Sequence, residues 1–277
     1  MLAALALLAA SAAPDACVPV EGAATLWARR ETRWVIVGEM HGTNETPGAF
    51  TNLVCLAVQS RGPVTVAIEY PADMQPVLDA WLASDGGEAA RTALLAAPFW
   101  RRSTQDGRTS VAFLQMLERL RVMHRAGTVR SVRAFCPPKD GPAVGDYNEA
   151  MADRLTKIAD AAPGLVMVLV GNFHAINHAM TTPQGSIRPA ASLLPANKKV
   201  TVDIVGTGGS MWACQMEGCH RYDYPAQPSG PSRIAPDTSE DQRYDMIYTL
   251  GKPYSAAKPA VPGVADTSPI KLPKIKP

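Results

Sequence analysis

Several patterns that mark common classes of protein are missing from this sequence of 277 residues. No Gly-x-Ser-x-Gly element is present to place a serine nucleophile on a strand-to-helix turn, which argues against an acyl-enzyme. Neither the His-Glu-x-x-His pattern of zinc-binding helices nor the Cys-x-x-Cys-His site of covalent haem occurs. The formal charge is only +2, with no dense basic stripe interleaved with aromatic residues, so nucleic acid is not expected as a partner. A small-molecule or peptide substrate is the expected partner.

A membrane-spanning run is missing as well. The apolar N-terminus, MLAALALLAASAAPDAC, is too short to cross a bilayer and carries small residues of the Ala-x-Ala type at Ala10, Ser11 and Ala12. We therefore predict a signal peptide over residues 1–16 and export to the periplasm or the medium, although no Lys or Arg precedes the apolar run. A disordered Ala-rich tail is the alternative. Lipid attachment at Cys17 is not expected, because Pro-Asp-Ala before it lacks the apolar residue that lipobox cleavage prefers.

The sequence contains five cysteines, which fits an oxidising compartment. Cys214 and Cys219 enclose a short loop and are the best candidates for a disulfide, since a structural zinc site would need further ligands nearby. Cys17, Cys55 and Cys136 could supply a second bridge and one free thiol. The sequence does not choose among these three.

Apolar runs rich in Val and Ile recur along the chain and alternate with helical patterns. Runs of this length are typical of strands buried on both faces, as in a parallel sheet. Their alternation with helices predicts an α/β fold, here a single domain with a mainly parallel central sheet flanked by helices. The predicted strands cover residues 33–38, 64–70, 129–135, 164–171, 200–206 and 244–250, and the predicted helices cover residues 45–59, 72–83, 109–125 and 145–162.

The last part of the sequence differs in composition from the rest. From Lys252 onward Pro, Ala and Lys dominate, with almost no periodic apolar face. We predict that residues 17–251 form the α/β domain and that residues 252–277 are a disordered or loosely attached tail.

Polar residues follow the apolar runs where a site is expected. In an open α/β sheet, ligands bind outside the carboxyl ends of the strands. Glu39 and His41 follow the first run, Glu69 ends the second, and His174 follows the fourth. Both histidines belong to a Gly-x-x-His pattern, in which glycine lets the backbone turn sharply and approach a ligand closely. The sequence therefore predicts that two histidines and two carboxylates lie together at the carboxyl ends of the strands, on one rim of the sheet.

Histidine can act as base, as acid or as metal ligand near neutral pH. Glu69 ends an apolar run, where a carboxylate is costly unless it is paired or hydrated. Structural roles are the alternative. Either His41 or His174 could be a hydrogen-bonded residue of the fold. Glu39 could simply accept backbone N–H groups of the following turn.

Other residues could contact a substrate. Trp100 and Arg108 lie in the segment FWRRSTQDGRTS, which would suit an anionic or carbonyl-bearing substrate or could be a solvated cationic loop. Asn148 lies in the first turn of a predicted helix, where its amide could reach the rim or cap the helix. Cys136 is predicted to be structural or disulfide-bonded, because the following prolines provide no helix N-terminus to lower its pKa.

Four short motifs taken together resemble the superfamily of erythromycin esterases, ChaN-like haem-uptake lipoproteins and Tiki/TraB proteins. They are Gly-Glu-x-His at 38–41, IEYP at 68–71, YNEAMA at 147–152 and VGNFHA at 170–175. The resemblance implies an α/β fold and members that are hydrolases, proposed metalloproteases or haem-binding proteins.

The family's functional residues match this sequence at Glu39, His41, Glu69 and His174. Erythromycin esterases usually have one more residue between the Glu and the His, so this chain looks closer to the ChaN-like and Tiki branches. Tyr147 replaces an Arg that the family commonly has, which puts any role of that Arg in doubt.

Three functions follow as hypotheses. The first is a hydrolase of ester or amide bonds, in which Glu39 or Glu69 orients His41, His41 acts as general base on water, and His174 serves as acid or stabilises the oxyanion. In a metal-assisted version, His41, His174 and Glu69 would hold a divalent ion. The second is a carrier of haem or another small ligand without turnover. The third is a degenerate member with a structural role.

Overall fold

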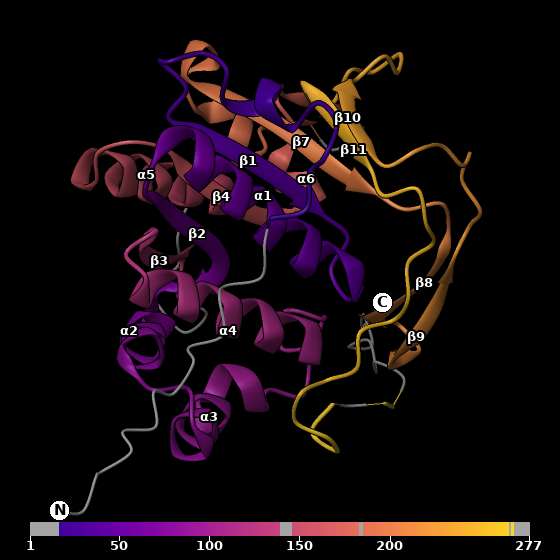
Figure 1. Cartoon of the computed structure of the whole chain (residues 1–277). Coiled ribbons are helices and arrows are strands. Elements are labelled where there is room, and N and C mark those ends of the chain that lie inside the picture. Colours follow the sequence, from indigo (N-terminus) through magenta and orange to yellow (C-terminus); the bar gives the residue numbers. More distant parts are fainter. Residues whose placement is uncertain (1–16, 139–145, 183–184, 266, 269–277) are drawn as a thin grey trace, which may run out of the picture.

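A seven-stranded sheet forms the centre of the computed structural model, with helices on both faces (Figure 1). The structure describes residues 17–138, 146–182, 185–265 and 267–268. The predicted signal peptide therefore lies outside the described residues. No helix in the described part is long and apolar enough to span a membrane.

The strand order is β10-β11-β7-β1-β4-β2-β3, and all neighbours are parallel except β10 and β11. The near-continuous Val and Ile runs form these strands because both faces of the sheet are covered. The α/β prediction is confirmed, and all six predicted strands are present. The strands are β1 (Trp34–Glu39), β2 (Val64–Pro71), β3 (Val129–Cys136), β4 (Val166–Gly171), β7 (Lys199–Val205), β10 (Arg233–Pro236) and β11 (Met246–Thr249).

The helices divide between two apolar cores. On one face, α1, α2 and α4 pack on side chains such as Val35 and Ile68; on the other, α5 and α6 pack on side chains such as Ile36 and Val168. All four predicted helices are present, and the unpredicted α3 lies beside α2. The helices are α1 (Glu45–Arg61), α2 (Gln75–Ala83), α3 (Glu88–Ala96), α4 (Val111–Arg125), α5 (Tyr147–Ala161) and α6 (Asn172–Ala175).

Two hairpins stand outside the sheet. One pairs β5 (Met180–Thr182) with β6 (Gly185–Ile187), and the other pairs β8 (Gly209–Gln215) with β9 (Gly218–Tyr224). Their sequences lack the Val and Ile runs that marked the central strands, so neither hairpin was predicted.

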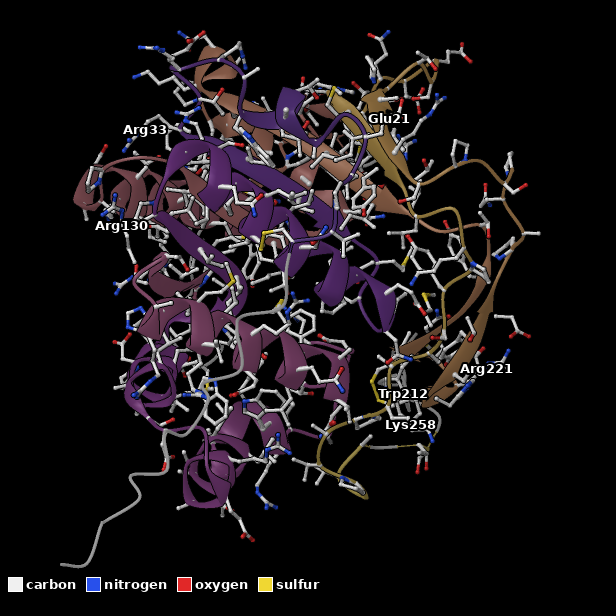
Figure 2. All side chains as sticks on the ribbon, in the orientation of Figure 1. Glu21, Arg33, Arg130, Trp212, Arg221 and Lys258 are labelled. Atoms are coloured by element: carbon white, nitrogen blue, oxygen red, sulfur yellow. A yellow bond between two sulfur atoms is a disulfide. The ribbon has the colours of Figure 1, made fainter. Side chains whose placement is uncertain are left out.

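The prediction of a disordered tail is wrong for its first part. Tyr254 and Ala257 are buried, and backbone hydrogen bonds join Ala257 N to Gly42 O and Ala260 N to Thr109 O. The segment 254–260 lies on the same side of the domain as the β8–β9 hairpin (Figures 1 and 2). Hydrogen bonds to loops hold it in place, and these require no periodic apolar face. Residues 269–277 of the predicted tail lie outside the described residues.

Two disulfides are present. Cys214 and Cys219 are bonded as predicted, and the second bridge joins Cys17 to Cys55, which leaves Cys136 as a buried free thiol. The short bridge closes the β8–β9 hairpin, since the two cysteines face each other across it.

Replacing both Cys214 and Cys219 by serine should lower the free energy of unfolding by about 2 kcal/mol, because only a short loop is released in the unfolded chain. Urea unfolding of the oxidised proteins measures the difference. The matched Cys17→Ser/Cys55→Ser variant should lose more, since its bridge spans 38 positions rather than 5. A greater loss from the short bridge would contradict this account.

Candidate active site

The carboxyl ends of β1, β4 and β2 lie next to one another and bring distant parts of the sequence to one rim. Glu39 stands opposite Gly171 in the register of β1 with β4, and Glu69 lies near the end of β2. Two residues after β1 ends at Glu39, His41 lies between the two carboxylates. Glu39, His41 and Glu69, which the sequence placed on one rim, are thus neighbours in space.

Glu39 holds one nitrogen of His41. Its side chain is buried, and Oε1 accepts a hydrogen bond from His41 Nδ1 at 2.7 Å. The other oxygen, Oε2, accepts from the hydroxyl of Thr46 in the first turn of α1 at 2.6 Å. Both oxygens of Glu39 are therefore engaged, and the imidazole ring has a fixed orientation.

Glu69 faces the other nitrogen of His41. Its Oε2 lies 3.4 Å from His41 Nε2 and accepts from the backbone N–H of Gly171 at 2.6 Å. Its Oε1 accepts from Arg108 Nη1 at 2.8 Å, and Arg108 in turn binds Asp106 through Nη2 at 2.5 Å. The carboxylate that sequence marked as costly is thus paired with a cation and a backbone donor.

This arrangement sets the charge on His41. Burial alone would lower the pKa of His41, but the negative charges of Glu69 and Glu39 and hydrogen bonds to both raise it to about 10. Burial alone would raise the pKa of Glu69, but the charges of His41 and Arg108 lower it to about 2. At neutral pH, His41 is therefore an imidazolium between two carboxylates.

His174 has the opposite character. Its Nδ1 lies 2.7 Å from Asn148 Oδ1, and this oxygen also accepts from the backbone N–H of Ala190 at 3.1 Å. Because Asn148 presents an acceptor, Nδ1 of His174 carries the proton and Nε2 has the lone pair. Burial, together with the charge of His41, lowers the pKa of His174 despite the charge of Glu69. His174 is a neutral imidazole at neutral pH. Asn148 does not cap α5, because Asp146 does so.

Close backbone approaches build the loops of the site. A Cβ at Gly171 would lie 3.1 Å from His41 Nε2, so this glycine makes room for the histidine. Gly42 has φ +82°, and a Cβ there would lie 1.8 Å from the carbonyl oxygen of Trp212. The expected sharp turn at Gly38 is wrong, because Gly38 continues β1 and Gly42 provides the left-handed turn.

Trp100 and Arg108, which were predicted to bind substrate, have their contacts within the protein. Trp100 is fully buried and its ring makes a T-shaped contact with Tyr70, so it has no surface to offer a substrate. Its place in the core reflects the aromatic cluster around Tyr70. Arg108 binds Glu69 and Asp106, so its guanidinium supports the site and is not part of a solvated cationic loop.

Burial raises the pKa of the Cys136 thiol, which is an inert core residue.

Sequence reasoning missed Asp203 at the end of β7, opposite Gly38 of β1. Its side chain is buried and its Oδ1 has no hydrogen-bond partner among the described residues. Burial, with the charges of Asp237 and Glu39, raises the pKa of Asp203 to about 7. The sequence contained a signal for Asp203, because this carboxylate interrupts the apolar run VTVDIV just as Glu69 ends an apolar run.

Three of the four ring nitrogens of His41 and His174 face oxygen atoms of the protein. Both nitrogens of His41 face carboxylate oxygens, and the protonated nitrogen of His174 faces an amide oxygen. Within the described ranges, no group of three or more His, Cys, Asp or Glu is arranged to hold a metal. The binding of haem stays a prediction.

No protein-family model and no curated relative match the sequence. Solved structures match by fold. A mutant of erythromycin esterase EreC in its open conformation gives a TM-score of 0.64 at 9% identity, over 84% of this chain and 93% of that chain. A succinoglycan biosynthesis protein gives a TM-score of 0.62 at 12% identity, over 82% of this chain and 89% of that chain.

Sequence identities this low establish only that the folds are alike. The predicted closeness to the ChaN-like and Tiki branches therefore stays a prediction. The likeness covers most of both chains in each pair. The chain shares the α/β fold of erythromycin esterase EreC and of the succinoglycan biosynthesis protein, in agreement with the fold that its motifs implied.

Proposed function

We propose that the protein is a hydrolase of ester or amide bonds that acts through an activated water. The observation that carries the proposal is the contrast between two histidines of the rim: His41 lies between two carboxylates, which favour its protonated form, and His174 lies against an amide, with its pKa lowered. Such a pair supplies an acid and a base at the same pH. The erythromycin esterase fold supports a hydrolase at a coarser level.

The protonation states assign the roles. Nε2 of His174 accepts a proton from water as the water oxygen attacks the carbonyl carbon. The Nε2–H of His41, which lies 3.4 Å from Glu69 Oε2 in the structure, would turn to the developing oxyanion and then give its proton to the leaving oxygen or nitrogen as the bond to carbon breaks. Transfer of the water proton from His174 back to His41, through solvent, restores the resting state. The sequence-based choice of His41 as the base is less favourable, because its two carboxylate neighbours hold its proton.

The carboxylates and Arg108 are positioning residues. Glu39 holds Nδ1 of His41, and Glu69 keeps the imidazolium charged while Gly171 and Arg108 fix its carboxylate. Asn148 fixes the tautomer of His174.

The pH dependence of kcat/KM tests these roles on a panel of small ester and amide substrates, from about pH 5 to about pH 11. The rate should rise with pH through a pKa below the usual 6.5 of histidine, as His174 loses its proton. It should fall near pH 10, as His41 loses its proton. Between these limits the rate should be flat.

The His178→Asn variant is the control, because His178 is exposed and, in the described part of the chain, its ring nitrogen bonds only to Asn177. It should reproduce the profile, whereas His174→Gln should lose the acid limb. Activity that is negligible at neutral pH and appears only above pH 10 would return the base role to His41. No turnover of any ester or amide in the panel would defeat the hydrolase proposal.

Export to an oxidising compartment is part of the proposal. The two disulfides support it, since such bonds persist outside the cytosol. Lipid attachment at Cys17 is disfavoured, because the sulfur of Cys17 is bonded to Cys55.

A further inference from the structure

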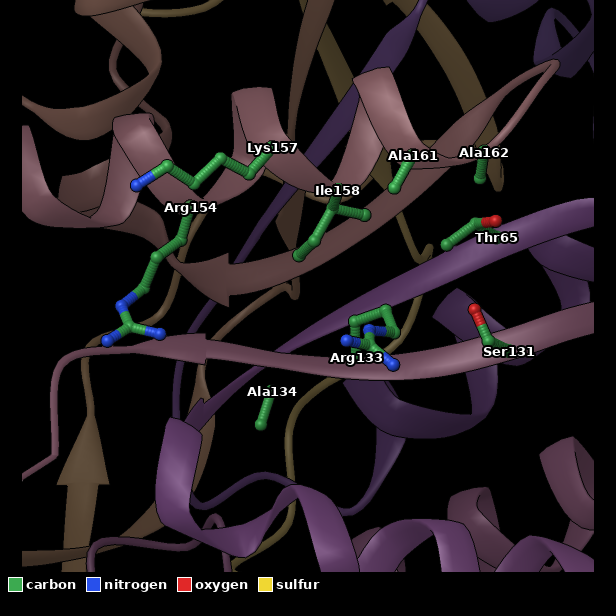
Figure 3. Close-up of a pocket in the computed structure, with 9 residues that line it drawn as sticks. All are labelled: Thr65, Ser131, Arg133, Ala134, Arg154, Lys157, Ile158, Ala161 and Ala162. Atoms are coloured by element: carbon green, nitrogen blue, oxygen red, sulfur yellow. The ribbon is translucent and has the colours of Figure 1, made fainter.

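A pocket lies on the face of the sheet that α5 covers, and it shares no residue with the candidate active site (Figure 3). Its volume is about 350 Å³, within the range of small-molecule sites. Thr65 near the start of β2 and Ser131 and Arg133 in the middle of β3 form one wall, and α5 forms the other. The pocket is thus set back from the strand ends that form the active-site rim.

The pocket is lined with positive charge. Arg133 stands on β3, and Arg154 extends from α5 toward that strand (Figure 3). Neither arginine has an ion pair or a hydrogen bond among the described residues. Lys157 also lines the pocket, but Asp153 pairs with it at 2.7 Å. Two guanidinium groups are therefore left without a counter-charge in a concave site.

A buried hydroxyl in the wall of the pocket is also unpartnered. Thr65 is 1% exposed, and its Oγ1 has no hydrogen-bond partner in the described part of the chain. A buried hydroxyl without a partner destabilises a fold, so a ligand that bonds to it would offset a cost already present. This second observation is independent of the arginines.

An extended peptide is not the expected occupant. The β3 strand is at the edge of the sheet, but the side chain of Gln75 donates to Val132 O at 3.0 Å and accepts from Ala134 N at 2.8 Å. The backbone groups that would pair with an added strand beside the pocket are therefore occupied.

We propose that this pocket binds a small organic phosphate or sulfate. Each guanidinium can bind two oxygens in parallel, so two arginines on opposite walls suit a tetrahedral group with three or four oxygens better than a carboxylate with two. Thr65 adds a neutral hydroxyl partner. Ile158 and Ala161 of α5, with Ala162 just after the helix, line the pocket with apolar surface for the carbon part of the ligand. The site is independent of the hydrolase proposal.

Thermal unfolding and calorimetric titration with inorganic phosphate, inorganic sulfate, phenyl phosphate and benzoate, at constant ionic strength, test the proposal. Phosphate and phenyl phosphate should stabilise the protein in a saturable way, and phenyl phosphate should bind more tightly because its ring contacts the apolar wall. Arg133→Ala and Arg154→Ala should each weaken binding about tenfold or more. Thr65→Val should weaken binding several-fold while leaving the unliganded protein at least as stable, because it removes an unpartnered hydroxyl of the same shape.

Arg130→Ala is the matched control, since Arg130 lies on the same strand but binds Pro63 O outside the pocket. It removes the same charge and should leave binding unchanged. Equal weakening in Arg130→Ala and Arg154→Ala would indicate general charge attraction and overturn the proposal. So would binding of benzoate as tight as that of phenyl phosphate, or no saturable effect of phosphate, sulfate or phenyl phosphate. If inorganic phosphate bound as tightly as phenyl phosphate, the pocket would be a site for a free oxyanion, and the proposal of an organic ligand would be overturned.

Discussion

Replacing His41 by asparagine is expected to lower kcat/KM for ester hydrolysis by about a thousandfold. Asparagine can still accept or donate a hydrogen bond, but it cannot carry the positive charge that stabilises the oxyanion or give a proton to the leaving group. Initial rates on the best substrate of the panel, measured at neutral pH, test the expectation.

The variant also leaves Glu39 and Glu69 without the cation between them, so its fold must be followed by circular dichroism and urea unfolding. Rates are compared only where the variant is folded. His124→Asn is the control, because His124 contacts Val129 O away from the rim. If folded His41→Asn kept more than a tenth of the wild-type rate, His41 would have only a structural role.

Replacing Arg108 by methionine should lower the free energy of unfolding at neutral pH by about 3–5 kcal/mol. Arg108 is the cation for two carboxylates, and Glu69 is only 6% exposed. Methionine keeps much of the side-chain volume but removes the cation that the two carboxylates share, which leaves His41 beside Glu69 and Arg102 beside Asp106. Urea unfolding at several pH values measures the loss.

The pH dependence separates lost charge from lost packing. In the wild type, the lowered pKa of Glu69 means that the stability from its ionisation is present above the unfolded pKa near 4.5 and is lost as pH falls toward 2. The difference between wild type and Arg108→Met should therefore shrink in acid. Arg243→Met is the matched control, because Arg243 forms an exposed pair with Asp241 and should cost less than about 1 kcal/mol. A loss that is the same at neutral and acid pH would indicate packing alone.

The location of the candidate site could be predicted because it depends little on the order of the strands in the sheet. Carboxyl ends of parallel strands share one edge whatever their order, so polar residues after apolar runs had to gather there. Glu69 was singled out because a carboxylate in an apolar run needs a partner, and its partner is Arg108. The same argument would have found Asp203.

The protonation of the site could not be predicted. It depends on Glu69 lying 3.4 Å from His41, although 28 positions separate them in the sequence. Trp100 was misjudged for a related reason: neighbouring arginines in the sequence indicated a surface loop, whereas the ring packs against Tyr70 in the core. Backbone hydrogen bonds that hold the segment after residue 252 leave no trace in composition.

The contact between Gly42 and the C-terminal segment bears on how the protein is made. The carbonyl oxygen of Gly42 accepts hydrogen bonds from the backbone of both Trp212 and Ala257. During synthesis, Ala257 leaves the ribosome more than two hundred residues after Gly42. The loop that follows His41 therefore lacks one of these two bonds until every strand of the central sheet has been translated, because the last of them ends at Thr249. An unfinished chain would expose the rim without this hydrogen bond.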